Sequence, residues 1–116
     1  MRFIFTVLFL VSFGSVSIGG VGDVYFCEMT NFVSVKDHER ITYYNQKFKF
    51  KWGQSQIKFG ESGYFEDVTI KIISQGDNTL EAKEGGMVLK FYKGNFYFGQ
   101  AGYFRVNSIS AKCEKF

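Results

Sequence analysis

The sequence contains one seven-residue phrase twice, and this repeat constrains the possible fold more than any other feature. Residues 59–65 read F-G-E-S-G-Y-F and residues 98–104 read F-G-Q-A-G-Y-F, an offset of 39 positions. At the same offset the flanking residues also match in character: Phe48 with Met87, Phe50 with Leu89, Lys51 with Lys90, Trp52 with Phe91, and Ile57 with Phe96. We therefore interpret residues 48–74 and 87–113 as two copies of one strand–turn–strand unit. Solenoids and propellers need about three or more units, so the repeat predicts pseudo-twofold symmetry within one small domain.

Apolar and polar residues alternate on the approach to each copy of the phrase. The clearest case is residues 47–52, where three lysines alternate with Phe48, Phe50 and Trp52. A period of two is typical of a half-buried strand. The glycines inside each phrase permit the sharp bend that would join one strand to the next. Aromatic-rich strands separated by glycine turns indicate an all-β protein.

The predicted strands lie at or near residues 24–30, 32–35, 41–45, 47–52, 56–59, 64–74, 79–83, 87–92, 96–98 and 103–114. Residues 36–40 are predicted to be a charged loop, and a short helix over residues 36–45 is the alternative. The resulting fold class is all-β: a small antiparallel, up-and-down barrel or two-sheet sandwich of about eight to ten short strands.

The first twenty residues have the layout of a secretory signal peptide. Arg2 precedes the apolar run of residues 3–13, and small residues follow. This run is too short for a membrane span, which takes roughly 20 apolar residues. We predict cleavage somewhere in residues 17–22, export to the periplasm or the extracellular space, and no transmembrane segment in the mature chain. Residues 21–116 then form a single β domain.

Cys27 and Cys113 are the two cysteines of the chain, and they lie in the first and last strands predicted for the mature domain. Each falls on the more apolar face of its strand. An exported protein meets an oxidising environment, so we expect a disulfide between them. Such a bond requires the first and last strands to be neighbours.

Charge and motif content argue against several functions. The mature chain has thirteen Lys+Arg against eleven Asp+Glu, about +2, which is too weak to favour nucleic acid. His38 is the single histidine and lies in the charged loop, so it predicts neither a catalytic cluster nor a metal site. No phosphate-binding loop, dinucleotide fingerprint or nucleophile elbow is present. We expect no enzymatic activity, no cofactor and no bound metal.

Two functional hypotheses remain. The first is a structural or interaction module on an envelope or particle surface, which contacts a protein or an anionic surface through Lys47, Lys49 and Lys51 and exposed strand faces. The alternative is a carrier-like or inhibitor-like binding module for a small apolar or sugar ligand, using Trp52, Tyr64 and Tyr103. We favour the first, because an interior with this many phenylalanines leaves little room for a ligand.

Overall fold

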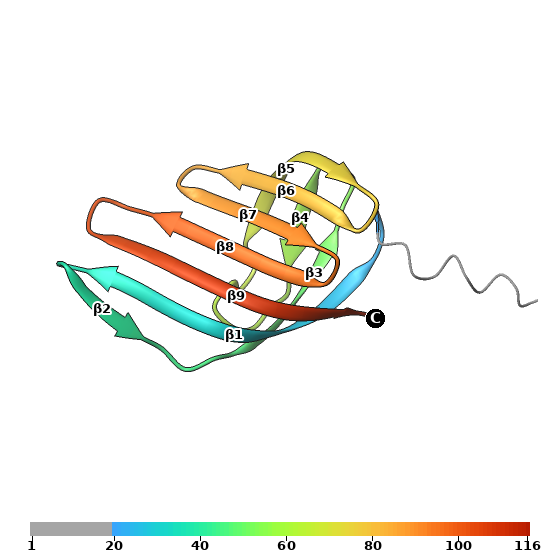
Figure 1. The fold of residues 1–116 in the computed structure, drawn as a ribbon. Coiled ribbons are helices and arrows are strands. Elements are labelled where there is room, and N and C mark those ends of the chain that lie inside the picture. Colours follow the sequence, from blue (N-terminus) through green and yellow to red (C-terminus); the bar gives the residue numbers. More distant parts are fainter. Residues whose placement is uncertain (1–19) are drawn as a thin grey trace, which may run out of the picture.

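The computed structural model describes residues 20–116, and within this range the chain forms strands and turns without a helix. In chain order (Figure 1) the strands are β1 (Val24–Lys36), β2 (Glu39–Thr42), β3 (Lys47–Trp52), β4 (Gln56–Phe59), β5 (Thr69–Gly76), β6 (Thr79–Glu84), β7 (Met87–Tyr92), β8 (Asn95–Ala101) and β9 (Arg105–Lys115). The predicted all-β class is confirmed. The leader predicted over residues 1–20 lies, apart from Gly20, outside the described residues.

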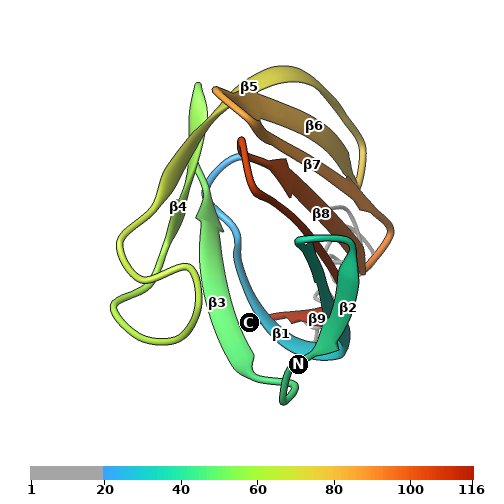
Figure 2. The same cartoon turned by 90° about the vertical axis from the view of Figure 1, so that its left-hand side faces the viewer.

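Eight of these strands close into an antiparallel, up-and-down barrel. Closure arises because β1 pairs with β3 along one edge and with β9 along the other. The remaining strand, β2, pairs with the far half of β1, where Val33 lies opposite Thr42 and Lys36 opposite Glu39. Figure 2 views the ring of strands from one end. The sequence left barrel and two-sheet sandwich open, and the structure is a barrel.

The two strands predicted at residues 24–30 and 32–35 are one continuous strand. The pairing of β1 with β9 shifts register between Met29 and Asn31, which marks a β-bulge. One extra residue changes the phase of the alternation. Met29 and Phe32 are therefore both buried, although an uninterrupted strand would place them on opposite faces. The bulge lets one long strand contribute to the core along its whole length.

The charged segment at residues 36–45 forms a tight hairpin. Asp37 and His38 occupy the turn with positive φ angles of 53° and 67°. Two positive φ angles give a two-residue turn the twist that neighbouring strands need, and glycine or asparagine usually fills these positions. Without that signal, the sequence predicted a longer loop over residues 36–40 and a strand only from residue 41. The strand begins at Glu39, and the short-helix alternative is wrong.

Aromatic rings fill the barrel interior. The period-two pattern of β3 directs Phe48 and Phe50 inward, and neither is more than 6% exposed. Phe48 contacts Phe96 with ring centroids 4.9 Å apart, and Phe50 lies 5.9 Å from Phe59. Phe59 in turn stacks on Phe65 at 4.3 Å. Phe50 and Phe59 are paired on the adjacent strands β3 and β4, whereas the contact between Phe48 and Phe96 joins β3 to β8 across the barrel.

The two copies of the repeat form β3–β4–β5 and β7–β8–β9, and they diverge after their glycines. Phe65 is 1% exposed and packs in the core, whereas its counterpart Phe104 is 79% exposed. In the first copy residues 60–68 form a loop in which the Asp67 amide donates to the Gly60 carbonyl at 2.8 Å. This loop is long enough to turn Phe65 inward. The strands predicted from residues 64 and 103 instead begin at Thr69 and Arg105.

Cys27 and Cys113 form the predicted disulfide. They lie directly opposite each other on β1 and β9, with Cα atoms 4.0 Å apart. The bond therefore links the two strands whose pairing closes the barrel. Because it encloses most of the described chain, the chain-entropy model assigns it about 4 kcal/mol of stabilisation.

The repeat provides a matched pair of variants for testing this description of the core. Phe65→Ala should lower the free energy of unfolding by about 3–5 kcal/mol, because it leaves a cavity among packed rings. Phe104→Ala should change it by no more than about 0.5 kcal/mol, because that side chain is exposed. Urea denaturation of the oxidised proteins measures both. Equal effects of the two substitutions would contradict the asymmetric placement of the repeat aromatics.

Candidate functional site

Trp52 belongs to the core and not to an accessible ligand site. Its side chain is 0% exposed, and its indole Nε1 donates a hydrogen bond to Gln75 Oε1 at 2.7 Å. The ring also lies edge-on to Phe91, 6.2 Å between centroids. The structure therefore gives Trp52 a role in the core, and its contact with a ligand stays a prediction.

Tyr64 anchors a polar network at one end of the barrel. Its hydroxyl accepts a hydrogen bond from Asn107 Nδ2 at 2.9 Å and donates to Gln100 Oε1 at 3.1 Å. Burial raises the pKa of this phenol above its usual value, although the bond from Asn107 acts in the opposite direction. Ser34, directly opposite Asn107, is fully buried, and within residues 20–116 its hydroxyl has no hydrogen-bond partner.

Tyr103, the third aromatic predicted to contact a ligand, is fully exposed in the turn between β8 and β9. The three aromatics therefore occupy different environments: Trp52 in the core, Tyr64 in the half-buried network and Tyr103 on the surface. The structure does not bring them together into one site.

The predicted lysine stripe lies on the outer face of β3. Lys47, Lys49 and Lys51 are all exposed and alternate with buried aromatics. Across the strand pair, Lys47 lies opposite Glu28 and Lys49 opposite Phe26. The stripe therefore has an acidic neighbour at one end and an exposed aromatic residue beside its middle.

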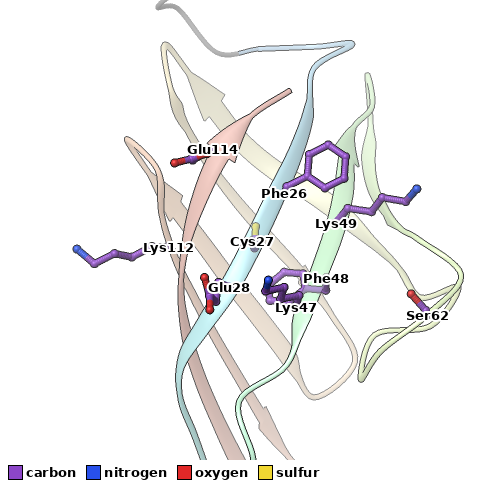
Figure 3. Close-up of a pocket in the computed structure, with 9 residues that line it drawn as sticks. All are labelled: Phe26, Cys27, Glu28, Lys47, Phe48, Lys49, Ser62, Lys112 and Glu114. Carbon is purple, nitrogen blue, oxygen red and sulfur yellow. The ribbon is translucent and has the colours of Figure 1, made fainter.

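A groove lies between this stripe and the loop of residues 60–68, which projects beside β3 and β4 (Figure 2). Its volume is about 870 Å³. Its floor includes Phe26 and Phe116, whose ring centroids are 5.2 Å apart in an edge-to-face arrangement. Figure 3 shows Phe26 and Lys49 projecting from neighbouring strands on the side of the loop that carries Ser62. We call this feature the Phe26 groove.

The outer surface of β1, β9, β8 and β7 carries a second feature, a contiguous area without a charged side chain among the described residues. We call it the neutral face, and Figure 1 shows its four strands side by side. Its outward residues are Val33, Val35, Val106, Ser108, Ser110, Tyr97, Gly99, Ala101 and Val88. Val35 lies opposite Val106, and Val106 lies opposite Ala101, so the row crosses three strands.

Exposed aromatics extend the neutral face at one end. Val35 and Val106 line a hollow of about 350 Å³ together with Tyr103 and Phe104, and Asp37, His38 and Arg105 line the same hollow at its charged rim. Charged residues mark its sides: Arg40 lies opposite Val35 at one edge. At the other edge Lys83 lies opposite Val88 and Lys90 opposite Tyr97. The surface is therefore an apolar and small-polar area with a largely cationic margin.

Sequence reasoning missed the neutral face and the floor of the Phe26 groove. The alternation in the last strand predicts that residues 106, 108 and 110 face outward. The residues of β1 and β8 that lie beside them are set by the register of the barrel strands, which the sequence does not predict. Phe26 lies on the less apolar face of its strand, and nothing in the sequence pattern marked it as part of a groove. Its contact with Phe116 depends on the closure of β1 against β9.

The acidic, histidine and cysteine side chains give no sign of a metal centre in the described part of the chain. Residues 20–116 contain no cluster of three or more His, Cys, Asp or Glu side chains arranged to hold a metal ion. His38 is exposed in the β1–β2 turn.

Within the same range there is no helix with the length and apolar character needed to cross a membrane.

Comparison with protein-family models, with curated proteins and with solved structures finds no match to this chain.

The Tyr64 network predicts an effect of pH on stability. Because its folded-state pKa is raised, the neutral phenol contributes stability that is complete below the unfolded pKa of about 10 and is lost as the pH rises through the folded value. Tyr64→Phe should cost about 1–2 kcal/mol at pH 7, since Asn107 and Gln100 lose their partner. It should also flatten the decline in stability at alkaline pH.

Tyr103→Phe is the matched control, because it removes the same hydroxyl at the equivalent, fully exposed repeat position. It should change neither the free energy of unfolding at pH 7 nor its decline at alkaline pH. Urea denaturation at pH 7 and at pH 10–11 measures them, and a Tyr64→Phe profile parallel to that of the wild type would contradict the account.

Proposed function

We propose that this chain is an exported, non-enzymatic interaction module that binds a protein partner through the neutral face. The observation that carries the proposal is an uncharged area across four adjacent strands, with exposed aromatics at one end. Large exposed apolar patches mark interaction sites, and interface centres are depleted in charge and enriched in aromatic residues. Val35, Val106 and Phe104 are 45%, 51% and 79% exposed, so they are available without rearrangement.

The charged margin indicates the chemistry of the partner. Arg40, Lys83 and Lys90 border the neutral face, and Glu81 is an acidic neighbour one strand beyond Lys90. A partner with an apolar patch and carboxylates around it would complement this arrangement. A second copy of the chain is less suitable, because facing copies would bring cationic margins together.

The filled interior favours this role over an internal carrier. Phe48 and Phe50 on β3 contact Phe96 on β8 and Phe91 on β7 across the barrel, and Trp52 is sealed. Binding chemistry is therefore expected on the outside.

Export is supported by two independent features. Residues 1–20 have the composition of a secretory leader, and the structure contains a disulfide that persists most readily in an oxidising compartment. Native mass spectrometry of the protein expressed with its own leader and recovered from the exported fraction should show a species cleaved within residues 17–22 and oxidised at Cys27–Cys113. A full-length or reduced species would contradict export.

A pair of substitutions tests the contact surface. Val106→Asp should weaken binding to the partner by about tenfold or more, because a charge would enter the centre of the interface. Ile73→Asp is the matched control: Ile73 is 52% exposed on β5, and Val106 is 51% exposed. Proteins of the exported fraction are captured with wild-type and variant chains and quantified by mass spectrometry.

The proposal requires one protein that the wild type and Ile73→Asp retain and that Val106→Asp loses. Matching thermal unfolding of the two variants shows that both are folded. Retention of every captured protein by Val106→Asp would exclude the neutral face as the contact surface.

A further inference from the structure

We propose that the Phe26 groove binds a free amphiphilic anion, an apolar chain or ring that bears one carboxylate, sulfate or phosphate group. Its volume of about 870 Å³ lies within the range of small-molecule sites, about 300–1,000 Å³. The groove is separate from the neutral face and the inference does not rest on the proposed function.

The floor of the groove offers an apolar surface that is held in place. Phe26 is 46% exposed and Phe116 is 89% exposed, although their rings contact each other. The amide of Phe116 donates to the carbonyl of Val24 at 2.8 Å, which fixes this residue beside β1. Val24 also lines the groove. An alkyl chain or ring placed here would cover aromatic surface that is otherwise exposed to water.

Three lysines beside this floor provide the cationic part of the site. Lys51 on β3 lies directly opposite Lys58 on β4, and like charges facing each other across strands are destabilising. Lys49 is the next outward residue on β3. Among residues 20–116 none of the three lies within 4.0 Å of a carboxylate oxygen. An anion bound between them would relieve the repulsion.

The neighbouring backbone at Gly60 sets the position of Lys49. A Cβ added to Gly60 would lie 2.9 Å from Lys49 Cε and 3.0 Å from its Cγ, so the lysine stem lies across the bare glycine. The Gly60 amide donates to the Lys49 carbonyl at 3.0 Å. The φ angle of Gly60 is not positive, so glycine matters here because its missing side chain leaves room for the Lys49 stem. The loop thereby directs one lysine along the edge of the groove.

Two carboxylates decide which anions fit. Glu61 and Asp67 from the loop line the same groove as Lys49, Lys51 and Lys58. Three lysine and two acidic side chains line the groove, so its side-chain charge is close to balanced. That balance suits a ligand with one anionic group and disfavours a polyanion such as nucleic acid or a sulfated polysaccharide. The exposed rings then select for an apolar body on the same molecule.

The second repeat copy lacks these features and supplies controls. Lys51 corresponds to Lys90, which lies opposite Glu81 and Tyr97 instead of another lysine. Gly60 corresponds to Gly99, where an added Cβ would meet its nearest neighbour, the Asn107 carbonyl, at 4.0 Å. Each groove substitution therefore has a counterpart at an equivalent position of the fold.

The test is a titration of the ¹⁵N-labelled, oxidised protein with monomeric decanoate, with decanol and acetate as controls for the charge and the chain. Decanoate should shift the amide resonances of Phe26, Lys49 and Phe116, and decanol and acetate should bind at least about tenfold more weakly. The double variant Lys51→Gln/Lys58→Gln should lose about tenfold or more in affinity, and Gly60→Ala should also bind more weakly. Lys90→Gln and Gly99→Ala should bind decanoate like the wild type.

Folding does not confound the comparison, because the lysine double variant removes a repulsion and should unfold at or above the wild-type temperature. The inference is overturned if decanoate causes no shifts at these residues, if decanol binds equally well, or if the lysine variant keeps wild-type affinity. Binding only to vesicles containing anionic lipid, and not to monomeric decanoate, would also overturn it, because the ligand would then be a membrane surface.

Discussion

The pairing of β1 with β9 is the interaction on which the rest of the structure depends. It runs from Tyr25 opposite Lys115 to Lys36 opposite Arg105 and joins the beginning of the barrel to its end. Without it the remaining strands would form an open sheet with two unprotected edges, and exposed edges promote aggregation. The Cys27–Cys113 bond lies within this pairing. Contacts between such distant parts of the chain form against a large loop-closure entropy, so a covalent link at this position stabilises the least local part of the fold.

Closure also determines where binding can occur. With period-two alternation, each inward aromatic has an outward neighbour, and a small barrel filled by side chains has no space for a ligand inside. The same strand β3 that places Phe48 and Phe50 in the core therefore presents Lys47, Lys49 and Lys51 to solvent. The last strand does the same with Val106 and Ser108. The surface of the barrel therefore differs from strand to strand because its outward residues differ, and these residues can vary without disturbing the core.

The sequence predicted the parts of the fold that depend on local pattern. The bounds of residues 47–52, 56–59 and 87–92 are those of β3, β4 and β7, because clear alternation and flanking turns specify them. The disulfide was predictable because two cysteines fell on inward faces of terminal strands. The bulge after Met29 was missed because a bulge needs no particular residue, and the Asp37–His38 turn was missed because it lacks the glycine or asparagine that usually fills such turns. Surfaces made by neighbouring strands were not predictable, because register places their residues together.

The two copies of the repeat present different exteriors around core positions that match in part. The core positions before the glycines match: Trp52 and Phe91 are both buried, and so are Phe59 and Phe98. Outside, the first copy combines an opposed lysine pair with a loop that covers a groove, and the second contributes Tyr97 and Gly99 to an uncharged face. Inward residues must keep their volume because a filled core tolerates little change. Outward residues are under no such constraint, so the two halves could diverge in charge and shape while the barrel itself stayed the same.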